Sequence, residues 1–373
     1  MQFARSSMKS SIYEEGLARI IYNSNVFLNP KAKLNRDISV VIAKEFFKGR
    51  FSVLDATSAT GIRAIRYAKE ANADPITVLD INEDAIDIIH RNLSLNNVNA
   101  TVIRDDIRSF SLRSDKRFNL IDIDPFGSPA LLVNSAFTLA SKRALLFVTA
   151  TDTAVLCGNK HRAALKKYNA ITFDSDISHE VGARILIYFI ARIASQYNFG
   201  IEPLAVLSYN TYIRLYLKIE RGDDKAMKSI ESYGFFYKCN ECGNQGLYTR
   251  YNIEQRCSVC NSRVNISGPL WIGKLFNERE SYSDALKDLA STYKANEWRW
   301  IIKAILEELD IPFYYYLPEI TSRLKKGSIS IDKLIELLRS NGYMASRTHF
   351  NKSAIKCSCS YSELKGIISD LKV

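Results

Sequence analysis

The run Asn119-Leu-Ile-Asp-Ile-Asp124 is mostly apolar, ends in an aspartate and is followed by Pro125-Phe126-Gly127. Similar runs precede it in the chain and end at Asp55, Asp80 and Asp106. Segments with helical periodicity lie between these runs, so strands and helices alternate. The alternation predicts a parallel sheet, and the carboxyl ends of parallel strands share one edge. We therefore expect these aspartates to gather at a ligand-binding edge.

The pattern of strands continues beyond this run. Residues 143–149 indicate a fifth strand, residues 181–196 a helix, and residues 200–209 and 212–219 two further strands. Asn210-Thr211 between the last two strands indicates a hairpin. The sequence thus predicts a Rossmann-like α/β domain with a seven-stranded sheet.

The composition is that of an ordinary globular protein. A length of 373 residues predicts two or more domains, and 47% hydrophobic and 24% charged residues are typical values. No apolar run reaches the roughly 18–20 residues of a membrane span, so we expect no membrane contact. Lysine and arginine number 51 against 40 aspartate and glutamate residues, a net charge of +11 that is compatible with a polyanionic partner. Many basic proteins bind no nucleic acid, so the charge alone leaves both options open.

Changes in pattern along the chain predict four segments. Residues 1–50 form an N-terminal leader that carries part of the cofactor and target site, and residues 51–234 form the α/β domain. Residues 235–282 hold an inserted cysteine module. Residues 283–373 have the periodicity of a mostly helical α+β domain.

This C-terminal segment carries a series of basic residues that interleave with Tyr343 and Phe350. Such a series is typical of a surface that binds a nucleic-acid backbone, and it is equally typical of a solvated helical face. Both interpretations stay open. The basic residues are Arg323, Lys325, Lys326, Arg339, Arg347, Lys352 and Lys356.

The turn after the first strand predicts a cofactor site. Asp55 is followed by Ala-Thr-Ser-Ala-Thr-Gly61-Ile-Arg63, where a strand turns into a helix. Gly61 lets the backbone approach a ligand, and the start of the helix offers free N–H groups. The dinucleotide fingerprint G-x-G-x-x-G is absent, which favours a cofactor without phosphates.

The ends of the next two strands extend this site. Asp80, followed by Ile81, can accept both hydroxyls of a ribose. Asp106 can accept from an adenine amino group, and Ile107 offers a backbone N–H and an apolar contact. An acidic edge suits a sulfonium, an amino-acid zwitterion, a ribose and an adenine, so we infer S-adenosylmethionine as the cofactor. The alternative for any single aspartate is a helix cap.

The Asp124-Pro125-Phe126-Gly127 motif indicates methyl transfer to an amino group on a flat ring. The amine of a base is a poor nucleophile because its lone pair is delocalised into the ring, so it must be held in line with the methyl donor. The Asp124 carboxylate and the Pro125 carbonyl can accept its protons, and Phe126 can stack on the base. We expect Asp124 to orient the amine and accept a proton. The alternative for the tetrapeptide alone is a turn after a strand.

The spacing of the cysteines predicts a metal site. Cys239-x-x-Cys242 and Cys257-x-x-Cys260 are two pairs at a separation that fits tetrahedral Zn2+. Four thiolates close the coordination shell, so the zinc is expected to be structural rather than catalytic. A redox pair is the alternative. Cys157 is expected to be packed, and nothing in the sequence indicates a disulfide framework, so a reducing cytoplasm is the expected compartment.

Several motifs in order resemble the tRNA (guanine-26) N2-dimethyltransferase family in its archaeal form. The resemblance implies a class I methyltransferase fold, tRNA as the partner, and transfer of one or two methyl groups from S-adenosylmethionine to N2 of guanine 26. The matching segments are residues 26–30, 35–39, 54–66, 121–129, 149–158, 179–182 and 268–271, followed by 347–350.

The resemblance also implies roles for individual residues. Asp124 matches the motif that holds the target amine. Leu28 stands where the family commonly has an aromatic residue, so Phe27 is the candidate for stacking on the base. The positions that match cofactor contacts are Arg36, Arg63, Asp80, Asp106 and Ile107.

Two other functions stay open from the sequence. A methyltransferase of this fold acting on adenine N6 or a protein glutamine typically carries Asn or Asp followed by Pro-Pro-aromatic, whereas here Phe126-Gly127 follows Asp124-Pro125. A non-catalytic RNA-binding protein is the second. We expect the chain to act as a monomer.

Overall fold

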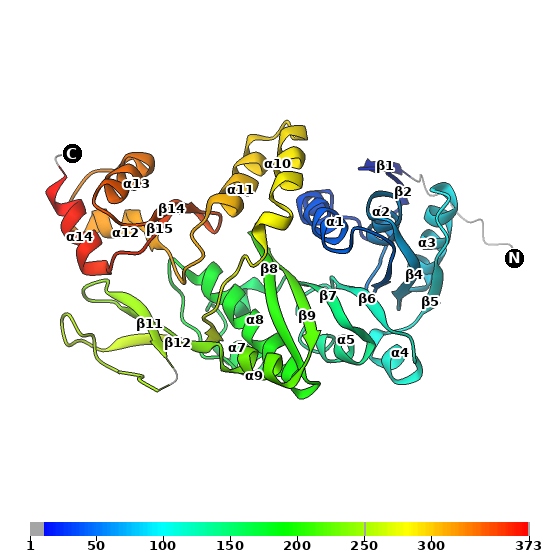
Figure 1. Cartoon of the computed structure of the whole chain (residues 1–373), viewed down its shortest axis with the longest axis horizontal. Coiled ribbons are helices and arrows are strands. Elements are labelled where there is room, and N and C mark those ends of the chain that lie inside the picture. Colours follow the sequence, from blue (N-terminus) through cyan, green and yellow to red (C-terminus); the bar gives the residue numbers. More distant parts are fainter. Residues whose placement is uncertain (1–10, 250, 372–373) are drawn as a thin grey trace, which may run out of the picture. The chain divides into compact units, whose positions relative to one another are not determined.

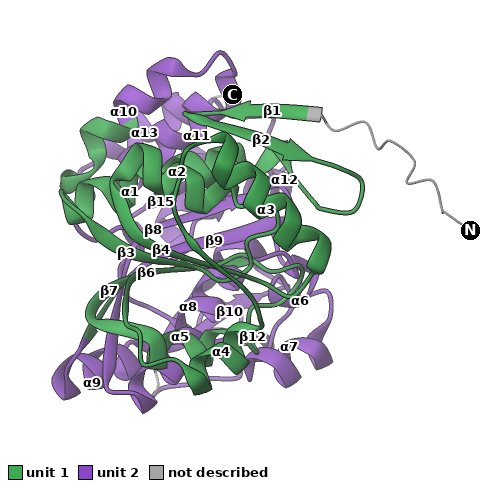
Figure 2. Ribbon diagram, turned by 90° about the vertical axis from the view of Figure 1, so that its right-hand side faces the viewer, with its two compact units in different colours: residues 1–149, 218–220, 280–286 green, residues 150–217, 221–279, 287–373 purple. Residues whose placement is uncertain are grey.

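The computed structural model describes residues 11–249 and 251–371, which divide into two compact units (Figures 1 and 2). Unit 1 comprises residues 1–149, 218–220 and 280–286. Unit 2 comprises residues 150–217, 221–279 and 287–373. Within the described ranges, no helix combines the length and the apolar character that a bilayer crossing requires.

Unit 1 alternates strands and helices as the sequence predicts, after an N-terminal hairpin that the sequence did not predict. Its elements in chain order are β1 (Ser11–Glu15), β2 (Ala18–Tyr22), the 3-10 helix η1 (Pro30–Ala32), α1 (Lys33–Phe47), β3 (Phe51–Asp55), α2 (Ile62–Ala71), β4 (Ala73–Asp80), α3 (Glu83–Leu95), β5 (Thr101–Arg104), α4 (Ile107–Arg113), β6 (Phe118–Ile123), α5 (Val133–Leu139) and β7 (Ala140–Ala150).

The main sheet has the strand order β5-β4-β3-β6-β7-β9-β8, where β8 is Phe199–Tyr209 and β9 is Tyr212–Arg221. Strand β3 pairs in parallel with β4 and β6, so that Asp55 lies opposite Val78 and Asp122. The register brings the carboxyl ends of these strands to one edge, as expected for parallel strands. The predicted seven-stranded α/β fold is confirmed.

Local sequence explains the turn between β3 and α2. All of β3 except Ser52 is buried, which is typical of a strand that is covered on both faces. Gly61 precedes α2 with φ of 79°, a left-handed conformation that glycine adopts without strain. A Cβ at Gly61 would meet only ordinary contacts, so the backbone angle rather than lack of space favours glycine there.

The N-terminal hairpin is held by two asparagine side chains of α3. Asn92 accepts a hydrogen bond from the amide of Ile21 (2.6 Å) and donates to its carbonyl (2.9 Å). Asn96 makes the same pair of hydrogen bonds with the backbone of Arg19, at 2.9 and 2.6 Å. One helical turn separates the two asparagines, so they present amide groups to β2 much as a neighbouring strand would.

Unit 2 begins with helices and continues into two small sheets. Its remaining elements are α6 (Thr153–Leu156), α7 (His161–Tyr168), α8 (Ser178–Gln196), α9 (Asp223–Glu231), β10 (Tyr233–Cys239), β11 (Gln245–Thr249), β12 (Val264–Trp271), η2 (Arg279–Ser281), α10 (Ser283–Thr292), α11 (Asn296–Glu307), β13 (Tyr315–Tyr316), α12 (Leu317–Arg323), α13 (Ile331–Ser340), β14 (Ala345–Thr348), β15 (Asn351–Cys357) and α14 (Tyr361–Asp370). The end of η2 and the start of α10 lie in residues assigned to unit 1.

The two small sheets carry the parts of unit 2 that matter below. Strands β11, β10 and β12 form an antiparallel sheet next to the cysteine cluster. Strands β13, β15 and β14 form a second antiparallel sheet, whose core includes Leu338, Ile355 and Leu364. The sequence predicted the helices around these sheets but not the three strands beside the cysteines.

Candidate active site and cysteine cluster

Asp124 lies just after the carboxyl end of β6, where its backbone and side chain are both held. Its amide donates to the hydroxyl of Thr57 (2.8 Å). Its Oδ2 accepts from Nε of Arg63 at 3.1 Å and also from Nη2 of the same guanidinium. Arg63 lies in the first turn of α2, so the β3–α2 turn and the end of β6 together fix the direction of this carboxylate.

The Arg63 guanidinium is itself fixed by further partners. Nη1 donates to Oδ1 of Asn35 (3.0 Å) and lies 3.8 Å from Oδ2 of Asp122. Burial acts to lower the pKa of Arg63, but the carboxylates of Asp124 and Asp122 outweigh it and raise that pKa well above its usual value. Arg63 is therefore permanently charged, and it favours the ionised form of Asp124.

Asp55 is buried beneath this ion pair rather than open to a ligand. Its Oδ2 accepts from the hydroxyl of Ser58 (2.6 Å). Burial, together with the nearby carboxylate of Asp122, raises the pKa of Asp55 to about 7. Tyr67 donates to Asp122 (2.6 Å) and so satisfies the other member of this acidic pair. Asp55 thus stabilises the turn through its bond to Ser58, and its carboxyl does not face solvent.

Asp80 organises the loop that precedes α2. One carboxylate oxygen accepts from the amide of Ala59 (2.8 Å) and the other from the amide of Asn82 (2.9 Å). The side chain of Ile81, next to it, is exposed. The structure therefore brings Asp80, Ile81 and the turn around Gly61 together at one edge of the sheet.

Asp106 acts as the N-cap of α4 and accepts from the amide of Arg108 (2.8 Å). The Arg108 guanidinium binds both carboxylate oxygens, and these hydrogen bonds lower the pKa of Asp106. The side chain of Ile107 is buried. Asp106 thus caps a helix, as the alternative interpretation expected, while the cofactor contacts predicted for Asp106 and Ile107 stay predictions.

Arg36 is buried and forms a bidentate ion pair with Glu15 of β1, with N–O distances of 2.6 and 2.5 Å. It also donates to the carbonyl of Asn29 (3.1 Å). Burial opposes ionisation of Glu15, but the hydrogen bonds and charge of Arg36, with help from Arg66, lower its pKa to about 2. Sequence reasoning missed Glu15, because nothing local marks a strand residue as the partner of an arginine in a later helix.

Two aromatic rings are exposed beside the Asp124 motif. Phe126 is 76% exposed and Phe27 is 55% exposed, and their ring centroids are 4.8 Å apart in an edge-to-face arrangement. Pro125 is half-buried between Asp124 and Phe126. A neighbouring pair of exposed aromatic side chains next to a fixed carboxylate could receive a flat ligand.

The four predicted cysteines lie together in unit 2. The sulfur atoms of Cys239, Cys242, Cys257 and Cys260 all lie within 4.8 Å of one another. Sulfur atoms arranged tetrahedrally at the usual Zn–S distance of about 2.3 Å would be about 3.8 Å apart. The Cys239–Cys260 and Cys242–Cys257 separations are both 3.5 Å, so the donor set fits a zinc ion.

The turns that hold these sulfurs follow the expected pattern. Gly243 donates its amide to the carbonyl of Cys239 (3.0 Å), and Asn261 donates to the carbonyl of Cys257 (2.9 Å). Both Gly243 and Asn261 have positive φ angles, of 83° and 59°. Each Cys-x-x-Cys pair therefore closes one tight turn.

The other cysteines lie away from this cluster. Cys157 is buried, and burial raises the pKa of its thiol to about 12, which fits the predicted packing role. Cys357 and Cys359 form a disulfide in the core of the second small sheet, a bond that the sequence did not indicate. His349 is buried against Glu308, which accepts from its backbone amide at 2.9 Å and contacts Nδ1 at 2.7 Å.

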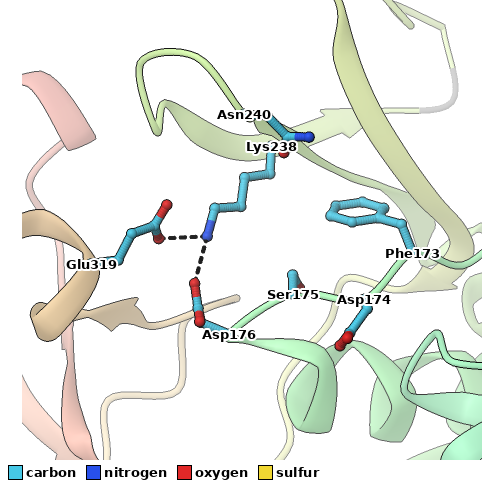
Figure 3. A pocket seen from close by; sticks show the side chains of 7 residues that line it. All are labelled: Phe173, Asp174, Ser175, Asp176, Lys238, Asn240 and Glu319. Atoms are coloured by element: carbon cyan, nitrogen blue, oxygen red, sulfur yellow. Dashed lines mark hydrogen bonds and ion pairs between the residues drawn. The ribbon is translucent and has the colours of Figure 1, made fainter. Parts of the chain in front are cut away.

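A cavity of about 350 Å3 lies in unit 2 beside the first cysteine pair (Figure 3). The ammonium group of Lys238 lies between the carboxylates of Asp176 (3.0 Å) and Glu319 (2.6 Å), as Figure 3 shows. The remaining lining residues are Phe173, Asp174, Ser175 and Asn240. Two carboxylates pair with Lys238, and Asp174 adds a third to the lining, so the formal charge of the cavity wall is negative and disfavours anions.

Comparison with known proteins places this architecture in a family. A family model described as N2,N2-dimethylguanosine tRNA methyltransferase matches residues 8–369. The chain belongs to that family. Its relatives include a tRNA (guanine(26)-N(2))-dimethyltransferase of Pyrococcus horikoshii, 36% identical over 93% of this chain and 95% of the relative. One from Methanosphaera stadtmanae is 32% identical over 98% of each chain.

A solved structure of the family shares the fold over nearly the whole chain. It is a complex of Trm1 from Pyrococcus horikoshii with S-adenosyl-L-methionine. The TM-score is 0.86 at 34% sequence identity, over 96% of this chain and 99% of that chain. The family resemblance predicted from the motifs is therefore confirmed, together with the fold that it implied.

Proposed function

We propose that this protein transfers one or two methyl groups from S-adenosylmethionine to the exocyclic N2 of guanine 26 in tRNA. Full-length membership of a family with this named activity supports the proposal. The observation that carries it is local. Asp124 is held by Arg63 at the end of β6, beside two exposed aromatic rings, which is the arrangement that an extruded base with an amino group requires.

The residues at the sheet edge fit S-adenosylmethionine. Asp80 ends β4, where a carboxylate can accept the hydroxyls of a ribose, and the turn around Gly61 lets the backbone approach a ligand. Exposed Ile81 offers an apolar wall for an adenine ring. Asp106 and Arg36 can contribute only if they share the hydrogen-bonding groups that now bind Arg108 and Glu15.

We assign the chemical roles as follows. The cofactor supplies an electrophilic methyl group on a positively charged sulfur. The lone pair of guanine N2 forms the new C–N bond while the S–CH3 bond breaks and its electron pair stays on sulfur. Asp124 and the carbonyl of Pro125 accept hydrogen bonds from the N–H groups of the amine and so orient its lone pair, and Asp124 takes the proton that is released.

Phe126 and Phe27 hold the guanine. Stacking on an aromatic ring replaces the stacking that the base loses when it leaves the RNA helix, and it is worth about 1–3 kcal/mol per base. In an edge-to-face pair the edge of one ring covers one face of the other, and the exposed surface that both rings retain is available to a planar ligand. We also propose that residues 1–50 complete this site and that residues 51–234 form the methyltransferase domain. Residues 283–373 are proposed to form a tRNA-binding domain through side chains other than Lys356 and Phe350, which are both buried.

The cysteine module, residues 235–282, holds a structural zinc ion through Cys239, Cys242, Cys257 and Cys260. Four thiolates leave no open position for water, so the ion organises the chain and takes no part in methyl transfer. We place the enzyme in the cytoplasm with its proposed tRNA substrate, acting as a monomer; the thiolate ligands fit a reducing compartment, whereas the Cys357–Cys359 disulfide does not follow from one.

The test is a nucleoside digest. The protein is incubated with S-adenosylmethionine labelled in the methyl group and an unmodified tRNA transcript that contains G26. We expect labelled N2-methylguanosine and N2,N2-dimethylguanosine, and no label with a matched transcript in which G26 is replaced by A. Equal labelling of both transcripts, or label in N6-methyladenosine, would overturn the proposed substrate.

A further inference from the structure

The basic residues of the C-terminal segment are mostly engaged within unit 2. Lys356 is fully buried, and its ammonium binds Glu180 (3.1 Å) and Glu308 (2.8 Å). Phe350 is also buried. The interpretation of this series as an RNA-binding surface is therefore wrong for Lys356 and Phe350, because neither side chain reaches solvent.

Other members of the series bind backbone carbonyls or neighbouring carboxylates. Arg323 donates to the carbonyls of Glu241 (2.7 Å) and Asn240 (2.8 Å), and so ties α12 to the first cysteine pair. The remaining partners are Ala345 for Arg339, Asp332 for Arg347, Glu297 for Lys352, and the carbonyls of Ser369 and Leu371 for Lys326. Carboxylates therefore pair with Arg323, Arg347 and Lys352. Backbone carbonyls occupy donors of Arg339 and Lys326 but leave their charge uncompensated.

Helix α7 differs from this series in both charge and partners. Residues 153–173 contain no aspartate or glutamate, and they carry Lys160, His161, Arg162, Lys166 and Lys167, all exposed. Lys167 binds Asp152 at 3.0 Å. For the side chains of Lys160, Arg162 and Lys166, residues 11–249 and 251–371 provide no hydrogen bond or ion pair.

The same face of unit 2 exposes apolar side chains. Leu165 of α7 is 55% exposed and Ile171, just after the helix, is 60% exposed. The helix is anchored from its other side by buried Ala164 and Tyr168, so the cationic side chains project from a fixed support. A helix with several uncompensated cations and no acidic residue has the charge that a phosphate backbone requires.

We propose that α7, with Lys160 before it, is a surface that contacts the phosphate backbone of the tRNA substrate. The inference rests on the proposed function and adds a location for part of the RNA contact. Lys160, Arg162 and Lys166 each neutralise a phosphate, and Leu165 packs against a ribose. The cavity of Figure 3 is a poor candidate for binding the phosphate backbone, since its carboxylates repel phosphate.

The test compares two charge-matched variants of the full chain. The α7 variant is Lys160→Gln, Arg162→Gln and Lys166→Gln. The control is Arg91→Gln, Lys228→Gln and Lys333→Gln, which removes the same charge from exposed positions on α3, α9 and α13. The affinity of each for an unmodified tRNA transcript is measured over a range of salt concentrations, and methyl transfer is measured at saturating tRNA.

We expect the α7 variant to bind tRNA about tenfold or more weakly, with the slope of log Kd against log salt reduced by about 2–3, while the control changes little. Methyl transfer at saturating tRNA should stay near that of the unchanged protein in both. An unchanged slope in the α7 variant, or an equal change in the control, would overturn the proposal. An α7 variant that binds tRNA as tightly as the unchanged protein would overturn it too.

These outcomes separate the two proposals. If the unchanged protein binds tRNA but methylates no guanine, the proposed function fails while the α7 surface is still tested by the salt dependence. Melting temperatures of both variants check that glutamine at these exposed positions leaves the fold intact. Lys167→Gln, a single change on the same helix, should reduce the slope less, because Asp152 already neutralises that ammonium.

Discussion

Arg63 and Asp124 form an ion pair in which two guanidinium nitrogens, Nε and Nη2, donate to one carboxylate oxygen, Oδ2. The sequence assigned these residues to different tasks, Arg63 to the cofactor and Asp124 to the target amine. The structure joins them, since the arginine that follows the cofactor turn also sets the direction of the proposed catalytic carboxylate. This relationship yields the first two predictions.

Replacement of Asp124 should separate chemistry from cofactor binding. Asp124→Ala removes the acceptor of the amine protons, so turnover should fall by about 100-fold or more. Calorimetry should find the affinity for S-adenosylmethionine changed only a few-fold, because Asp80 and the Gly61 turn remain. Asp124→Asn is the isosteric control and should also be inactive, since it removes the charge but keeps the volume. Equal loss of binding and turnover would contradict the role given to Asp124.

Arg63→Lys tests whether Arg63 positions Asp124. A lysine keeps the charge but cannot make both hydrogen bonds to Oδ2 while also reaching Asn35. We expect kcat to fall about tenfold or more, with the KM for S-adenosylmethionine little changed. The reverse pattern, a raised KM with normal kcat, would show that Arg63 serves the cofactor, as the sequence suggested.

The two exposed phenylalanines should contribute to kcat/KM for tRNA and not to the affinity for the cofactor. Phe126→Ala and Phe27→Ala should each weaken transition-state binding by about 1–3 kcal/mol, measured as kcat/KM for tRNA. Phe126→Tyr should restore most of it, because a tyrosine ring stacks as well. Leu131→Ala, at another exposed apolar position of unit 1, is the matched control. A similar loss in the control would indicate a general surface effect.

Loss of the metal should lower the stability of the fold, and the zinc ion takes no part in the methyl-transfer step. Cys257→Ser removes one of four ligands, so metal analysis should find well below the roughly one equivalent of zinc expected for the unchanged protein, and the melting temperature should fall by several degrees. Cys157→Ala, outside the cluster, should retain the metal. Normal stability after complete zinc removal would exclude a structural role for the ion.

Asp55 predicts a pH dependence of stability. Its pKa is raised to about 7 in the folded chain, so between the ordinary carboxyl value and about 7 the folded state binds more protons than the unfolded state. The free energy of unfolding should therefore decline as the pH rises through this window. Asp55→Asn should remove that decline, making the variant more stable than the unchanged protein at pH 8 and no more stable near pH 3.5. A constant difference across this range would contradict the proposed burial cost.

The sequence predicted the main sheet well because several of its strands are short apolar runs that end at an aspartate or a turn. Asp55, Asp80 and the Asp124 motif end their strands as expected, and the cysteine spacing identified its cluster. These features are local in the sequence. A residue's type and its distance from a turn were enough to place it on the edge of the sheet.

What the sequence could not supply were the partners of charged side chains. Arg36 binds Glu15 and Lys356 binds Glu180, and each pair joins elements far apart in the chain. A buried arginine or lysine has the same local pattern as an exposed one until its tertiary neighbours are known. For this reason the basic C-terminal series gave a misleading candidate surface.

The asparagine pair of α3 has a consequence for solubility. A free strand edge offers a row of backbone donors and acceptors to which another chain can attach, a common route to aggregates. By occupying the amide and carbonyl groups of Ile21 and Arg19, Asn92 and Asn96 cap that row with a helix. The outer edge of β2 is therefore protected against intermolecular strand addition at these two residues, and loss of either side-chain amide would expose backbone groups to which another strand can pair.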